Sequence, residues 1–135
     1  MKPTISALFL FALLIGAGIP AWAHHSFAAA YDMTKPVTVQ GTIVQVRLTN
    51  PHSFFFIDVK EPNGTITHWQ FEAGTPSGMI RNGYKPSEIK GGSVVTIKGF
   101  HAKDPSQNAG MLDTLITADG KSFSRFGPQQ GPGAQ

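Results

Sequence analysis

The segment 37–48, VTVQGTIVQVRL, alternates between apolar and polar side chains, and the phase of this alternation changes within it. The apolar residues up to Ile43 share one face of an extended chain, whereas those from Val44 onward share the opposite face. A change of phase close to a glycine, here Gly41, is typical of a bulged and strongly bent strand. A strand of this kind can pair on both sides of a small closed sheet, and it therefore favours a barrel.

Four further short strands are predicted, at residues 54–60, 65–73, 93–100 and 111–118. Turn signals separate them: Asn-Pro after the first strand, and Asn-Gly, which tolerates positive φ, between the second and third. No long stretch has the 3.6-residue period of an amphipathic helix. The chain is therefore expected to be all-β.

One short helix is predicted near Pro76–Asn82, with Thr75 as its N-cap and Pro76 at its first position. Five strands with a helix between the third and the fourth is the order of an OB-type barrel. We therefore expect a small five-stranded OB-like barrel, and a β-sandwich is the alternative.

The first 23 residues have the pattern of a secretory signal peptide. Lys2 gives a positive start, residues 5–18 form an apolar run, and Ala21-Trp22-Ala23 is a small-x-small cleavage sequence. An uncleaved membrane anchor is the alternative, but the run is shorter than the roughly 20 apolar residues that a spanning helix needs. We expect cleavage between Ala23 and His24 and a periplasmic or secreted protein.

The mature chain is expected to hold one domain. Residues 24–36 read as an N-terminal arm, 37–125 as the barrel, and 126–135, rich in Pro, Gly and Gln, as a disordered tail. Cysteine is absent, which excludes disulfides and thiolate sites. Without Lys2, ten of the eleven basic residues remain against eight acidic ones, so the charge gives no argument for nucleic acid. No membrane span is expected after cleavage.

The second and third strands carry the candidate binding face. Alternation places Phe55, Ile57, Trp69 and Phe71 in the barrel core. The outer face then carries Phe54, Phe56, His68 and Gln70, and strands 2 and 3 form the ligand face of OB barrels. Two outer phenylalanines need a cover: a ligand, a partner, or the chain's own arm through Phe27 and Tyr31, which is the reading we favour.

The histidines suggest a second kind of site. His52 and His101 fall in the two loops that flank this face, and cleavage would make His24 the amino terminus, followed by His25. Imidazole is a common ligand of copper and zinc, and a terminal histidine adds its amine as a chelate, which favours copper. The set His24, His25, His52 and His101 is therefore a candidate metal site. The alternative is five separate histidines, because no HxH or HxxxH spacing occurs: two disordered at the terminus, His52 capping a turn, and His68 and His101 solvated.

Catalysis is weakly supported. Ser26 or Ser53 beside a histidine would suit a hydrolase, but no nucleophile-elbow motif accompanies either of them. Asp58 and Glu72 could face each other across strands 2 and 3, as glycoside hydrolysis requires. The sequence instead favours a non-catalytic binding module for an unidentified protein or small molecule, with no certain cofactor and with copper or zinc binding as the alternative.

Several stretches together resemble a known family. They are HHSFAAAYD directly after the signal peptide, VTVQGTIVQV, NPHSFFFIDV, HWQFEAGTPSGMIRNGY, GGSVVTIKGFHAKD and ADGKSF. The chain resembles a family of small exported bacterial proteins of unknown function, with an HHSF mature N-terminus and an NPH turn. The resemblance implies an exported, single-domain, mostly β protein, and it brings no catalytic or binding residues with it.

Overall fold

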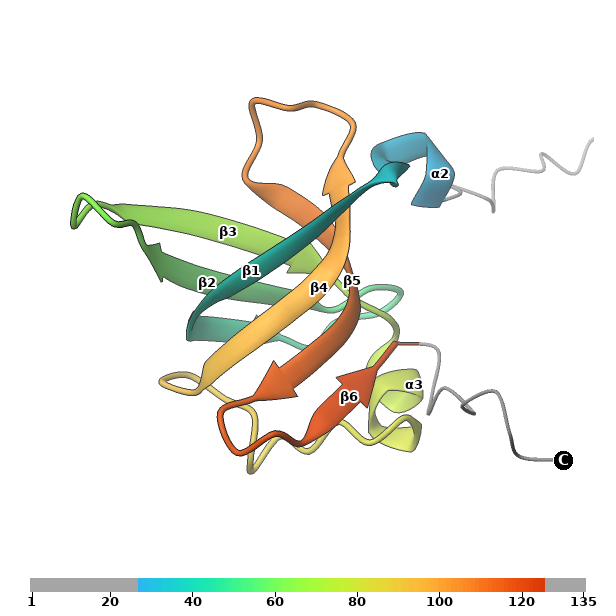
Figure 1. The fold of residues 1–135 in the computed structure, drawn as a ribbon. Coiled ribbons are helices and arrows are strands. Elements are labelled where there is room, and N and C mark those ends of the chain that lie inside the picture. The colour runs from blue at the N-terminus through green and yellow to red at the C-terminus, as the bar shows by residue number, and fades with distance from the viewer. Residues whose placement is uncertain (1–26, 126–135) are drawn as a thin grey trace, which may run out of the picture.

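The computed structural model describes residues 27–125 of the chain (Figure 1). The predicted signal peptide, the predicted tail, Ser26 and the pair His24 and His25 lie outside the described residues. Among the described residues, no helix is long and apolar enough to cross a membrane.

Short helices and six strands make up the described chain. In order they are α2 (Phe27–Ala30), β1 (Tyr31–Arg47), β2 (Phe54–Lys60), β3 (Ile66–Glu72), α3 (Pro76–Arg81), β4 (Val94–Ala102), β5 (Ala109–Thr117) and β6 (Ser122–Ser124). The sheet order is β3-β2-β1-β4-β5-β6, and β3 also pairs in parallel with β5. The first five strands therefore form a closed ring, and β6 extends it beside β5 (Figure 1). This confirms the all-β barrel with its short helix between the third and fourth strands.

Strand β1 serves both sides of the barrel because it is long and bent. Its first part pairs with β4 and its last part with β2. The register with β2 shifts between Ile43 and Gln45, so Val44 is the bulged residue that the change of phase predicts. A β-carbon at Gly41 would lie 2.4 Å from the carbonyl oxygen of Asp58, so only glycine lets β1 and β2 approach at the bend.

The strand ends differ from those predicted. β1 begins at Tyr31, not at residue 37, because Tyr31 and Pro36 still have partners on β4 across an irregular register. Half of the predicted arm is therefore strand. β4 runs on to Ala102 and β5 starts at Ala109, which shortens the predicted 101–110 loop to residues 103–108. The three-residue strand β6 has too little sequence to show a period, and the sequence did not predict it.

The core fills the ring with the side chains that alternation turns inward. Phe55, Ile57 and Phe71 are fully buried, and Trp69 is half-buried against the same cluster. This confirms the inward face of β2 and β3. A second, smaller cluster joins Tyr31, Ala102 and Met111 at one end of the barrel, where Phe27 packs on it.

Helix α3 packs against the barrel core through Met79. The Thr75 hydroxyl accepts from the Gly78 N–H at 3.2 Å, and Pro76 occupies the first turn, as predicted. Met79 on α3 is buried in the core. After the helix, the Tyr84 hydroxyl donates to the Ile89 carbonyl at 3.1 Å and ties the following loop to the core.

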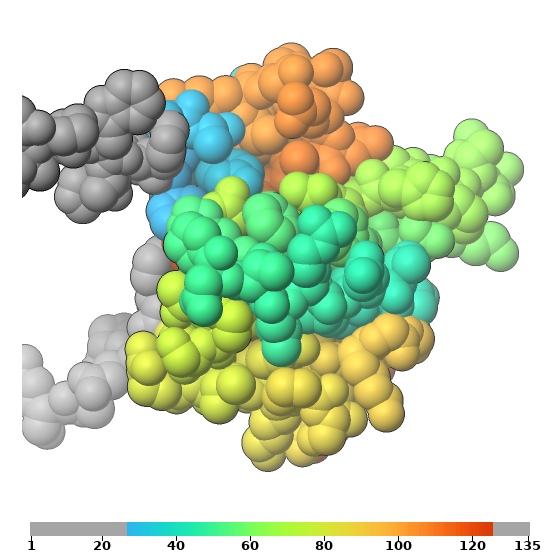
Figure 2. All heavy atoms as spheres, turned by 180° about the vertical axis from the view of Figure 1, so that it is seen from behind, coloured from blue at the N-terminus to red at the C-terminus, as the bar shows by residue number. Residues whose placement is uncertain are grey.

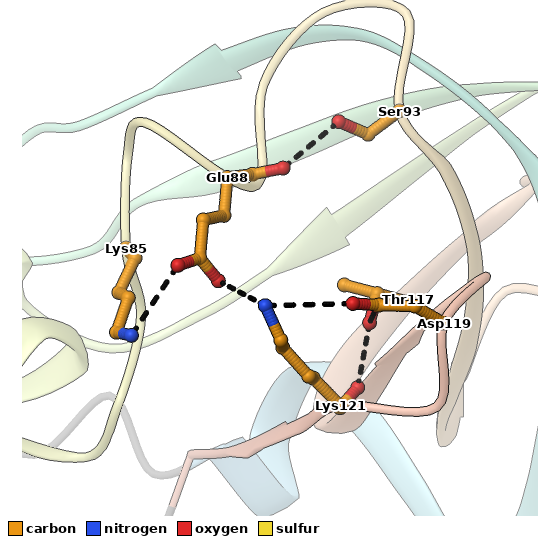
Figure 3. A network of polar contacts seen from close by, with 6 residues as sticks. All are labelled: Lys85, Glu88, Ser93, Thr117, Asp119 and Lys121. Carbon is orange, nitrogen blue, oxygen red and sulfur yellow. Dashed lines mark hydrogen bonds and ion pairs between the residues drawn. The ribbon is translucent and has the colours of Figure 1, made fainter.

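A surface network joins that loop to the β5–β6 turn (Figure 3). Glu88 accepts from Lys85 at 3.3 Å and from Lys121 at 3.2 Å, and Lys121 also pairs with Asp119 at 3.4 Å. Thr117 donates to Asp119 and holds the turn. These groups are exposed, so the network orients the turn and adds little to stability.

The close approach of β4 and β5 at Gly99 gives a stability prediction. A β-carbon there would lie 1.9 Å from the Met111 carbonyl oxygen, a backbone atom that cannot turn away. Gly99→Ala should lower the free energy of unfolding by about 2 kcal/mol or more, as overpacking does. Urea unfolding measures it, with Gly74→Ala as the control, since its β-carbon would meet only Met79 at 3.9 Å. Equal stability of the two variants would contradict the packing described here.

Candidate functional site

A groove of about 410 Å³ lies on the outer side of β2 and β3, where the bulge of β1 and the β4–β5 loop border it. Its lining residues are Val44, Gln45, Phe56, Ile57, Asp58, His68, Trp69, Gln70 and Asn108. The groove arises because β3 pairs with β5 only over Gln70–Glu72, so the outer half of the β2–β3 hairpin extends past the ring (Figure 1).

Three of the four residues predicted for the binding face line this groove: Phe56, His68 and Gln70. Phe54 does not line it, because it lies opposite Glu72 at the far end of the same strand. The sequence did not predict Gln45 and Asn108. The change of phase at Val44 could have predicted Gln45, since the bulge reorients the residues beside it. Asn108 lies in the β4–β5 loop, where no alternation predicts which way a side chain faces.

Two polar side chains of the groove, Asp58 and His68, form a pair. Asp58 and His68 face each other across the strands, with Asp58 Oδ1 and His68 Nδ1 2.6 Å apart. The His68 side chain is 80% exposed, so this pair is open to solvent. The Arg47 guanidinium lies 5.0 Å from the centre of the Phe56 ring. Arg47 therefore covers part of the outer aromatic surface.

The N-terminal segment packs at one end of the barrel, in the cluster of Tyr31, Ala102 and Met111. That Phe27 and Tyr31 cover Phe54 and Phe56 stays a prediction. Tyr31 pairs with Ala102 of β4, on the side of β1 away from β2. Phe27 packs against the cluster that Tyr31 forms with Ala102 and Met111. The Phe27 ring centre lies 5.1 Å from that of His52 and 6.3 Å from that of Tyr31.

Glu72 is the centre of a second site, where α2 meets the β1–β2 loop. The Tyr31 hydroxyl donates to Glu72 Oε2 at 2.5 Å, and His52 Nδ1 pairs with Glu72 Oε1. These residues border a hollow of about 550 Å³ that Phe27, Ala29, Ala30 and Pro51 complete. Figure 2 shows the N-terminal segment in blue against the green β1–β2 loop.

Arg125 closes this site from the end of β6. Its guanidinium carbon lies 3.4 Å from the centre of the Phe27 ring. Burial lowers the pKa of Arg125, and the negative charges of Glu72 and Asp113 oppose that effect. Burial raises the pKa of Tyr31, and the hydrogen bond and charge of Glu72 raise it further. Tyr31 therefore stays protonated and donates to the carboxylate.

His101 contacts residues close to it and lies apart from His52. His101 Nδ1 lies 2.8 Å from the Ala102 carbonyl oxygen, and its ring packs edge-on against Trp69. Successive strand residues face opposite ways, so His101 points away from the cluster around Tyr31 that Ala102 joins. Within residues 27–125, no group of three or more His, Asp or Glu side chains could hold a metal ion. A site that uses His52 would need ligands from beyond that range.

The structure also bears on the weaker catalytic readings. Ser53 is completely buried and cannot meet a substrate. Asp58 lies opposite His68 and Glu72 opposite Phe54, so the two carboxylates do not face each other as predicted. The register of the Asn63-Gly64 hairpin places Glu72 opposite Phe54, four residues along β2 from Asp58.

Both tyrosines provide a pH prediction. Burial raises the pKa of Tyr84 as well as that of Tyr31, from an ordinary 10.0. The unfolded chain therefore loses these protons first as the pH rises. The free energy of unfolding should fall above pH 10, by up to about 1.4 kcal/mol per pH unit for each tyrosine.

Urea unfolding between pH 8 and pH 11 measures this fall, and Tyr31→Phe should make it shallower. In a Tyr84→Phe background, Glu72→Gln should lower the pKa of Tyr31, read from phenolate absorbance. An unchanged Tyr31 titration would show that Glu72 does not hold the hydroxyl.

Comparison with known proteins identifies the family. No curated protein and no solved structure matches the chain. A family model described as a family of unknown function, DUF6152, matches residues 12–111, which include α2, the bent strand β1, both faces of β2 and β3, and the groove. The match covers well over half of the chain, and the chain therefore belongs to the DUF6152 family of unknown function.

Proposed function

We propose that this protein is an exported, non-catalytic binding module whose ligand occupies the groove on the outer face of β2 and β3. The observation that carries the proposal is the groove itself, which holds Phe56, His68 and Gln70 together on one face. The location follows from the predicted signal peptide at residues 1–23, and it makes the protein periplasmic or secreted.

The lining indicates the kind of ligand. Gln45, Gln70 and Asn108 each offer an amide that both donates and accepts hydrogen bonds. Phe56 and Val44 add apolar surface, and Val44 is 57% exposed. The only charged side chain in the described lining, Asp58, is paired with His68. Amides beside an aromatic ring suit a small, polar molecule without a net charge, such as a sugar or a dipeptide.

The residue types that line the groove favour binding without catalysis. Of the described residues around the groove, none is a serine, threonine, lysine or tyrosine that could act as a nucleophile. Asp58 and His68 bond to each other on an open surface, where water screens them. A fixed acid or base would need a drier setting.

Trp69 makes the proposal testable. It lines the groove, and after removal of Trp22 with the signal peptide it is the one tryptophan of the chain. We expect its fluorescence to change with a member of a panel of neutral oligosaccharides, amino acids and dipeptides. Phe56→Ala and Gln70→Ala should each weaken that binding by about 10-fold, or about 1.4 kcal/mol.

The matched control is Ile80→Ala, since Ile80 is 54% exposed on α3 and lies outside the groove. Binding that Phe56→Ala leaves unchanged, or the absence of a response to every member of the panel, would contradict a small-molecule groove.

Metal binding is the second candidate, with His24, His25, His52 and His101 as the predicted set. The contact between His52 and Glu72 favours it, because metal-binding histidines are commonly held by a carboxylate. The position of His101 against Trp69 argues against its taking part. Copper is favoured over zinc because the terminal amine of His24 would act with its ring.

Titration of the mature chain with Cu²⁺ and Zn²⁺ tests this second function. The chain that begins at His24 should bind one Cu²⁺ ion, and a version whose terminal amine is acetylated should bind at least about 100-fold more weakly, since the blocked amine cannot coordinate. Equal weak binding by both versions would exclude the terminal chelate.

A further inference from the structure

We propose that the ligand of the groove is an extended, uncharged peptide whose backbone pairs with the free edge of β3 at residues 66–68. The inference rests on the proposed binding function and deepens it, because it names the class of ligand and the backbone groups that hold it. Among the small polar molecules that the lining suits, it selects a peptide over a sugar.

Strand β3 has a free edge over its first half. Toward β2 it is paired along its whole length, from Ile66 to Glu72. Toward β5 it is paired only from Gln70 to Glu72. Among the strands of residues 27–125, none pairs with residues 66–68 on this second edge, where β3 runs past the ring (Figure 1). An added strand would therefore continue the line that β5 occupies farther along β3.

The backbone groups of this free edge point away from β2. The Gln70 N–H donates to the Asn108 carbonyl at 3.0 Å, on the side of β5. Every second residue of a strand directs its N–H and C=O to the same side, so those of Ile66 and His68 point the way that those of Gln70 do. Each of these two residues offers one donor and one acceptor. Alternating donors and acceptors at this spacing match the backbone of another extended chain.

The edge lacks the features that usually prevent strand addition. Natural proteins block exposed edges with lysine, proline or a bulge. The sequence ITHW of residues 66–69 contains neither lysine nor proline, and its register with β2 is unbroken. Ile66 is 48% exposed, and the His68 side chain is 80% exposed. The edge is therefore open to an incoming strand.

The two faces of β3 indicate which side chains the peptide carries. A strand beside β3 would direct its side chains alternately to the two faces of the sheet. On the outer face they would meet His68 and Gln70 in the groove, with Asn108 at its border. On the inner face they would meet Thr67 and the half-buried Trp69. The amides favour polar side chains and the indole favours apolar ones, so the expected peptide alternates between the two.

Length separates this ligand from a dipeptide. Ile66 and His68 lie two residues apart along β3, which corresponds to roughly 7 Å. A chain of at least three residues is needed to bond both of them. A pentapeptide with blocked ends covers the edge and adds no charge.

The experiment titrates the mature chain with acetylated and amidated pentapeptides that alternate threonine with valine, leucine or phenylalanine, and it follows Trp69 fluorescence. A peptide that binds is then compared with two N-methylated versions, which carry the methyl groups on the alternate amides of one edge or of the other. Only one edge of the peptide faces β3. One version should therefore bind at least about 10-fold more weakly than the other, because it has lost its hydrogen bonds to the strand.

A matched pair of protein variants tests the same edge from the other side. Ile66→Pro removes an N–H that points away from β2, so the β2–β3 pairing can remain. Ile66→Ala removes the side chain but keeps the N–H. The proline variant should bind the pentapeptide at least about 10-fold more weakly than the alanine variant. Urea unfolding shows whether the proline variant is folded, and the N-methylated peptides decide the question with the wild-type protein if it is not.

Equal binding of the two N-methylated versions, or no response to any pentapeptide, would overturn the inference. Binding of a sugar or dipeptide that Phe56→Ala weakens would in that case leave the groove function standing, whereas no response to any compound would remove both. A wild-type dimer in sedimentation velocity that Ile66→Pro dissociates would assign the edge to a second copy of the chain and would also overturn the peptide.

Discussion

The bend of β1 is the constraint on which the rest of the structure depends. One strand must pair with β4 in its first part and with β2 in its last part, and it changes direction between them. Gly41 allows the close approach to Asp58, and the bulge at Val44 turns the remaining residues to the other face. The ring closes only because of this change, which also creates the wall of the groove on one side.

The same bend separates two surfaces of different chemistry. The end of β1 brings Val44 and Arg47 over β2, beside the amides of the outer groove. At the beginning of β1, Tyr31 pairs with Ala102 at the end of β4. There the Tyr31 hydroxyl donates a hydrogen bond to Glu72 of β3. In the groove, Asp58 and His68 pair with each other in contact with solvent. The Glu72 carboxylate is instead largely buried, where it bonds Tyr31 and His52.

Glu72 joins elements that are distant in sequence. It holds Tyr31 at the start of β1 and His52 in the β1–β2 loop, and Arg125 lies close enough for its charge to act on Tyr31. The stretches AAAYD, NPHS and QFEAG, which carry much of the resemblance to the family, meet at this point. Their shared role is structural in the described residues, since each one places a partner around a single carboxylate.

The sequence by itself determined the local features: the strand alternation, the phase change in β1, the N-cap of α3, the Asn-Gly turn and the inward face of β2 and β3. These depend on neighbours along the chain, so the period and the turn residues reveal them. The groove residues Phe56, His68 and Gln70 were predictable for the same reason, since they follow from alternation within one hairpin.

Only the tertiary structure decided which distant groups meet. Strand register placed Asp58 against His68, not against Glu72, and long-range packing carried Phe27 to His52 and Tyr31 to Glu72. The early start of β1 and the short strand β6 exist because partner strands hold them. A hydrogen bond between residues 41 positions apart, such as Tyr31 to Glu72, leaves no periodic trace in the sequence, because its geometry is set by closure of the whole barrel.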